Sequence, residues 1–169
     1  MSRIPVRTLV LSIADCIQMQ NGIAQIDAGR EITVDNKNVR RGYKLDTDIR
    51  YALARIGILI KPVIEAWSKA NEQLFKDCEP VTETDKDGKD ELRVPTHKLI
   101  EYKAALAELQ EKKTTLELPL VSLKNLKVGD EKDQNPIPSS ALTNLQKVLD
   151  MTGTSLDSPS DNTNEEPEG

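Results

Sequence analysis

The segment DIRYALARIGILIKPVIEAWSKANEQL, residues 48–74, carries the most regular pattern in the chain. Its apolar residues recur at alternating spacings of four and three, the heptad pattern of a helix that packs along one face. They are Ile49, Leu53, Ile56, Ile60, Val63, Trp67, Ala70 and Leu74. We expect a long helix from about residue 48 to Asp77, and we call its apolar face the seam.

Pro62 lies inside this segment, where a proline removes one backbone hydrogen bond and costs a helix about 3 kcal/mol. Two interpretations stay open: one continuous, kinked helix, or two helices that meet at Lys61. The heptad phase continues across Pro62, whereas a break between helices normally resets it. The pattern therefore favours the kinked helix.

A second helix is expected at about residues 97–113, after a cap at Thr96, because Leu99, Tyr102, Leu106 and Leu109 repeat the same spacing. The chain between the two helices has an Asp-Gly turn at 87–88, flanked by short strands at 80–84 and 91–94. We therefore expect an antiparallel helical hairpin with a small β-hairpin at its tip. The long helix exceeds its partner by more than a dozen residues, so part of the seam needs another cover.

The remaining segments predict short elements around this hairpin. Residues 6–20 have helical spacing, and residues 31–45 predict a β-hairpin that turns at 35–38. Residues 115–123 alternate as a strand that could join this β-hairpin, and a last short helix should begin after a cap at Ser139 or Ser140. The expected fold class is mainly α with minor β (α+β), in one domain of residues 1–152.

Acidic residues are concentrated at the C-terminal end. Six of the 28 acids lie in residues 150–169, which hold no Lys or Arg, so 22 acids face 23 bases over residues 1–149. We expect residues 153–169 to be a disordered acidic tail, because they hold too little apolar surface to fold. A nearly neutral body exerts no long-range attraction on a phosphate backbone, so nucleic-acid binding is not favoured.

The sequence gives no pattern for insertion into a membrane. Its apolar runs fall short of the roughly 20 residues that span a bilayer, and the N-terminus lacks a signal-peptide pattern. We therefore expect no membrane partner, a cytosolic chain and two reduced cysteines.

Residues that could carry chemistry are few and scattered. His97 is the single histidine, and Cys16 and Cys78 lie far apart in the sequence. The polar turn that starts at Asp85 resembles the opening of a calcium-binding loop. Its twelfth residue is Thr96, however, where such a loop needs an acidic ligand. We expect no catalytic residue, no metal site and no cofactor, and therefore no enzyme.

Two surfaces remain as candidates for binding. The first is the seam, with Trp67 as an anchor because tryptophan is enriched at interface hot spots. Its partner-binding residues are Ile49, Leu53, Ile56, Ile60, Val63, Trp67 and Leu74. The second surface is a basic patch made of Lys37, Arg40, Arg41, Lys44 and Arg50. Three covers for the surplus seam stay open: the N-terminal helix, the last helix, or a second chain. The second chain would be a protein partner or another copy in a homo-oligomer, and the surplus length is the main argument for it.

Several stretches together resemble a pattern in small proteins of tailed bacteriophages. They are YALARIGILIKPVIEAWSKANEQL (51–74), the Asp-Gly turn at 87–88, LAELQ (106–110), TLELPLVSLKNLKV (115–128) and IPSSALTNLQKVLDM (137–151). The resemblance covers about residues 43–151. The chain departs from the pattern at Ile56, where the pattern often has Asn, and in its tail.

This resemblance implies a phage origin and a non-catalytic accessory role, and it supplies no catalytic residue. The function we expect is that of a phage interaction protein, a virion or assembly component that acts through the helical-hairpin seam. It would be located in the virion or in the host cytoplasm. The alternative is an inhibitor of a host or anti-phage defence protein, with the acidic tail as a nucleic-acid mimic.

Overall fold

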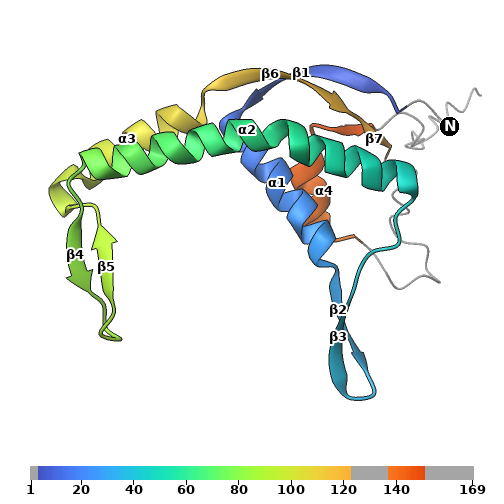
Figure 1. Ribbon diagram of the computed structural model, residues 1–169, viewed down its shortest axis with the longest axis horizontal. Helices are drawn as coiled ribbons and strands as arrows, with labels where there is room; N and C mark the ends of the chain where they lie inside the picture. Colours follow the sequence, from blue (N-terminus) through green and yellow to red (C-terminus); the bar gives the residue numbers. More distant parts are fainter. Residues whose placement is uncertain (1–3, 123–136, 151–169) are drawn as a thin grey trace, which may run out of the picture.

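The computed structural model describes residues 4–122 and 137–150 (Figure 1). The fold is α+β, with helices predominating over small two-stranded sheets. The predicted tail at 153–169 lies outside the described residues. In chain order the elements are β1 (Val6–Ser12), α1 (Ile13–Ala28), β2 (Arg30–Val34), β3 (Lys37–Arg41), α2 (Thr47–Asp77), β4 (Val81–Thr84), β5 (Asp90–Arg93), the 3-10 helix η1 (Thr96–Lys98), α3 (Leu99–Gln110), β6 (Lys113–Pro119), β7 (Val121–Ser122), α4 (Ser139–Leu145) and β8 (Leu149–Asp150).

Helix α2 is the axis of the molecule, and the other elements are arranged along it (Figure 1). It runs through Pro62 without interruption, so the interpretation of two helices meeting at Lys61 is wrong. The exposed Pro62 ring can be accommodated there because the proline lies off the seam. A bend at Pro62 stays a prediction.

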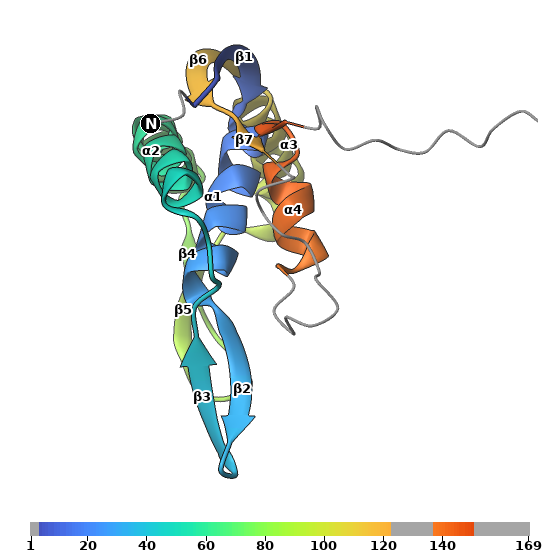
Figure 2. The same ribbon diagram turned by 90° about the vertical axis from the view of Figure 1, so that its right-hand side faces the viewer.

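The hydrophobic core surrounds the N-terminal half of α2. Helix α1 packs against α2, α4 packs against α1, and the β1–β6 ribbon crosses the side opposite the two β-hairpins (Figures 1 and 2). Most of the core residues are aliphatic, as the scarcity of aromatic residues requires. The largest fully buried side chains include Leu11, Met19, Ile56, Ile60, Leu118 and Leu145.

The expectation of a helix over residues 6–20 is wrong in its first half. Residues Val6–Ser12 form strand β1, and α1 begins only at Ile13. Ser12 ends the strand because it caps α1: its hydroxyl accepts from the Asp15 N–H at 3.1 Å, and the Asp15 carboxylate accepts from the Ser12 N–H at 2.9 Å. Helical and strand spacings coincide in so short an apolar run, and pairing with β6 decides between them.

The strand expected over residues 115–123 exists, but its partner differs from the expected one. Strand β6 pairs antiparallel with β1, with Leu9 opposite Leu116, and does not join β2 and β3. Pro119 stands at the end of β6, where the missing amide hydrogen costs no ladder bond. Strand β7 continues the chain and pairs in parallel with β8.

Both expected β-hairpins are present, and they project from the same side of α2 as two arms (Figures 1 and 2). The β2–β3 arm turns at Asp35 and Asn36, which both have positive φ, the conformation that a tight hairpin turn requires. At its base Gly29 ends α1 with φ +67, and a Cβ there would collide with the carbonyl oxygen of Arg41. The β4–β5 arm turns at Asp85, whose carboxylate accepts from the backbone N–H groups of residues 87 and 89.

The expected helix caps are wrong at two places. The residue before η1 is Pro95 and the residue before α4 is Pro138, so Thr96 and Ser139 lie inside their helices. A proline fixes its own φ and holds the extended conformation that precedes a helix. The last helix nevertheless docks on the core as expected, with Leu145 and Val148 fully buried.

Candidate protein-interaction surface

The structure divides the seam into two halves with different surroundings. Ile49, Leu53, Ile56 and Ile60 are at most 4% exposed and belong to the core of the chain itself. The second half, from Val63 to Leu74, extends beyond α1 and is accompanied by α3. Val63, Trp67 and Leu74 are only half-buried, and Ala70 is exposed. Of the expected partner-binding residues, Val63, Trp67 and Leu74 therefore remain accessible.

Helix α3 returns along α2 and forms the expected hairpin (Figure 1). The Tyr102 hydroxyl donates to Asn71 Oδ1 at 3.0 Å, and the Tyr102 ring meets Phe75 edge to face with a centroid distance of 6.3 Å. At the tip Lys98 Nζ lies 2.7 Å from Glu79 Oε2. The Lys98 ammonium lowers the pKa of Glu79, and the hydrogen bond to Glu79 raises the pKa of Lys98.

These contacts do not close the hairpin. All twelve residues of α3 are described, and none of them is buried. Ile100 is 84% exposed. The Trp67 indole Nε1–H is buried without an acceptor among the described residues, which costs roughly 1–3 kcal/mol. Two helices alone cannot bury the apolar faces that they present, so this part of the molecule lacks a third layer.

Two adjoining hollows follow one face of the hairpin, and together we call them the α2–α3 groove. Their volumes are about 480 Å³ and 380 Å³, and they share Ala70, Leu109 and Lys112. Small residues (Ala66, Ala70 and Ala105) and larger apolar residues line the groove. The larger apolar residues are Val63, Trp67, Leu74 and Leu109.

The charges of the α2–α3 groove are separated along its length. Lys113 lines only the hollow next to β6, together with Val63, and Lys112 lines both hollows. Asp77 and Glu108 line the hollow toward the free end of the hairpin. The groove therefore has an apolar floor, with Lys113 at one end, Asp77 and Glu108 toward the other end, and Lys112 between them.

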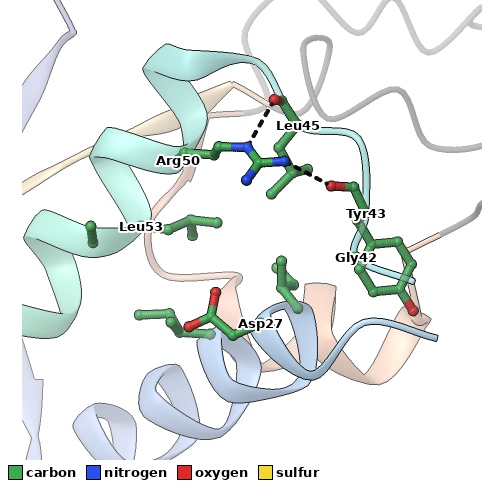
Figure 3. A pocket seen from close by; sticks show the side chains of 9 residues that line it. Asp27, Gly42, Tyr43, Leu45, Arg50 and Leu53 are labelled. Atoms are coloured by element: carbon green, nitrogen blue, oxygen red, sulfur yellow. Dashed lines mark hydrogen bonds between the residues drawn. The ribbon is translucent and has the colours of Figure 1, made fainter. Parts of the chain in front are cut away.

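The basic patch does not form one cluster. Arg50 projects from α2 to a hollow of about 230 Å³ at the base of the β2–β3 arm (Figure 3). Its Nε donates to the Leu45 carbonyl and its Nη2 to the Tyr43 carbonyl, both at 3.2 Å. Asp27 of α1 lines the same hollow. Arg50 thus fixes the loop that connects the arm to α2.

The other basic residues of the patch, Lys37, Arg40, Arg41 and Lys44, are exposed on β3 and the loop after it. Cross-strand partners share a face of a hairpin, so Glu31 lies beside Arg40, whereas Arg30 lies beside Arg41. One face of the arm consequently carries Arg30, Lys37 and Arg41 together. The face can attract an acidic group, but the described residues form no pocket there to define a ligand.

The residues that could carry chemistry are separated or already engaged. Cys16 is fully buried, and burial, followed by the charge of Asp15, raises the pKa of its thiol. A raised pKa opposes formation of the thiolate that a nucleophile requires. Cys78 is also buried, and His97 is exposed in η1. Within residues 4–122 and 137–150 no group of three or more His, Cys, Asp or Glu could hold a metal ion.

Comparisons with known proteins do not identify the chain. No protein family matches it, and neither the curated proteins nor the solved structures contain a match. In the described part of the chain, no helix combines the length and the apolarity needed to cross a membrane.

Sequence reasoning identified Trp67 and the surplus length of the long helix, but it missed the floor of the α2–α3 groove. Ala70 belongs to the seam, and Ala66 precedes it by four residues, a spacing that places both on one helical face. Together with the uncovered seam, this alanine pair is the signal that could have located the groove.

Proposed function

We propose that this protein is a non-enzymatic interaction protein of a tailed bacteriophage, a virion or assembly component that binds a protein through the α2–α3 groove. The observation that supports the proposal is the open hairpin: a helix without a buried residue, next to an apolar groove with charged ends. The resemblance of residues 43–151 to small phage proteins supports the phage role.

The shape of the groove favours a helix as the bound element. The alanine floor lets a third helix approach closely, and Trp67 and Leu109 offer large apolar surfaces beside it. Burial of apolar surface contributes about 25 cal/mol per Å², so covering the groove would stabilise both the hairpin and the complex. Recognition of a helix in an apolar groove is a common mode of protein binding.

The alternative proposal is an inhibitor of a host or anti-phage defence protein. Like the first proposal, it involves no catalysis, but the partner is a host or defence protein. The acidic composition of residues 153–169 supports this alternative. In this case the protein would act in the host cytoplasm and would not remain in the finished particle.

Quantitative proteomics of purified particles of the encoding phage tests the proposal. We expect the chain at a fixed ratio to the structural proteins. Ala70→Lys, which places a charged side chain on the groove floor, should remove it from the particles. Ala107→Lys is the matched control, because Ala107 is an exposed alanine of α3 outside the groove. Absence of the wild-type chain from particles and from assembly intermediates would contradict the structural role and favour the inhibitor.

A further inference from the structure

We infer that the occupant of the α2–α3 groove is the same hairpin of a second copy of this chain, packed antiparallel about a two-fold axis near Ala70 and Leu109. This inference rests on the proposed function, because it names the partner of the same groove. The result would be a bundle of four helices, two from each copy.

The dimensions of the groove fit the hairpin itself. On α2 the groove extends from Pro62 to Asp77, roughly 22 Å at 1.5 Å per residue. Helix α3, with twelve residues, spans roughly 18 Å along the same direction. Two helices side by side are roughly 20 Å wide, so the face has an outline of about 440 Å², the size of a small interface that associates reversibly.

The groove also alternates small and large residues, as a self-complementary face must. Ala66 and Ala70 form low positions on α2, and Trp67 and Leu109 form raised positions on either side. An antiparallel two-fold axis at Ala70 sets residues equally distant from Ala70 against each other, so Leu74 of each copy lies over Ala66 of the other. Interdigitation of this kind gives helical bundles their packing density.

The distribution of charge selects the orientation and the partner. Only the hollow next to β6 is lined by Lys113, and only the hollow toward the free end is lined by Asp77 and Glu108, with Lys112 between the two. Antiparallel packing sets the basic end of each copy against the acidic end of the other. Parallel packing would instead place like charges together, which costs binding free energy. A second copy therefore carries the complementary pattern without any further assumption.

Charge reversal tests this arrangement in the full chain. The basic-end variant is Lys112→Glu with Lys113→Glu, and the acidic-end variant is Asp77→Lys with Glu108→Lys. Each variant alone should repel its own copy, whereas an equimolar mixture should associate, and the variant with all four changes should associate again. All four positions are exposed, so each variant should keep the wild-type circular dichroism spectrum and melting temperature within a few degrees.

Light scattering on a sizing column, over a hundredfold range of concentration, is the measurement. The wild-type chain should reach twice its mass of 18.8 kDa, and each single-end variant should need at least tenfold more protein to do so. Recovery of the dimer in the mixture would support the inference with particular force, because misfolded variants could not restore each other. A wild-type monomer at every concentration, or a dimer indifferent to both reversals, would overturn it.

The two proposals can fail separately. If the wild-type chain is a monomer but Ala70→Lys still removes it from particles, the groove binds a different protein: the proposed function stands and the second copy is excluded. If the dimer obeys the charge reversals but the chain is absent from particles and assembly intermediates, the second copy is supported and the phage structural role fails.

Discussion

Two glycines in the middle of helices should respond oppositely to the same substitution. Gly22 of α1 is buried where α4 crosses it, and a Cβ there would lie 2.9 Å from Leu145 Cγ and 3.0 Å from the Ala141 carbonyl oxygen. Gly57 of α2 has free space beside it, since the nearest atom, Ile23 Cδ1, would be 3.9 Å from a Cβ. We predict that Gly57→Ala stabilises the protein and that Gly22→Ala does not.

The magnitude follows from two opposing terms. Alanine is favoured over glycine inside a helix by about 0.8–1.0 kcal/mol, and both substitutions gain this amount. At Gly22 the added methyl group overpacks the contact between α1 and α4, which typically costs about 1–3 kcal/mol. Gly57→Ala should therefore raise the free energy of unfolding by nearly 1 kcal/mol, and Gly22→Ala should leave it unchanged or lower it by up to about 2 kcal/mol.

Urea unfolding followed by circular dichroism measures both variants against the wild type. The difference between the two variants is the informative quantity, because the helix propensity term cancels in it. We expect a difference of about 1–3 kcal/mol, or roughly 2–12 °C in melting temperature for a chain of this size. Equal stabilisation by both substitutions would refute the close packing of α1 on α4.

Three further outcomes are expected. Pro62→Ala restores the backbone donor that α2 lacks, so it should raise the free energy of unfolding by up to about 3 kcal/mol in the same urea assay, and a loss of stability would contradict the continuous helix. Tyr102→Phe deletes the hydrogen bond to Asn71 and should cost about 0.5–1.5 kcal/mol in thermal unfolding; an unchanged melting temperature would show that the bond contributes nothing. Burial raises the pKa of Cys16, so its thiolate forms first in the unfolded chain. The contribution of this thiol to stability is complete below about pH 8.5 and declines as the pH rises toward the folded pKa. Urea titrations at pH 7–10 should therefore show a steeper decline for the wild type than for Cys16→Ala, and parallel curves would contradict it.

The helical hairpin could be predicted from the sequence because its signals are local and agree with one another. The heptad spacing fixes the face of α2, and the Asp-Gly turn at 87–88 fixes the position of the β4–β5 arm. The Asp35–Asn36 turn does the same for β2 and β3. Each of these signals lies within the element that it determines, so no long-range contact was needed.

Strand β1 could not be predicted in the same way because its partner lies more than a hundred residues away. The spacing of Val6, Leu9 and Val10 is compatible with a helix and with a strand. Only the pairing of β1 with β6 decides between the two. Leu11 and Leu118, both at most 1% exposed, then come from neighbouring strands of this ribbon. Tertiary pairing overrides local propensity in such short segments.

The candidate site was predicted in part. Trp67 and Leu74 were expected to bind a partner, and they remain half-buried beside the α2–α3 groove. Ile56 and Ile60 carry the same pattern but are buried in the core. A heptad shows which residues of a helix face a neighbour. It cannot show whether this neighbour belongs to the same chain, because burial along α2 depends on how far α1, β6 and β7 extend beside it.

Hydrogen exchange read by mass spectrometry at low and high protein concentration tests the central claim, that a second chain covers the α2–α3 groove. We predict that peptides covering residues 62–77 and 99–110 exchange at least tenfold more slowly in concentrated protein than in dilute protein. Peptides of α1, which lies in the core of each copy, should exchange at one rate throughout. Exchange in the hairpin that is equally slow at every concentration would mean that the chain closes its own groove, and would contradict the account.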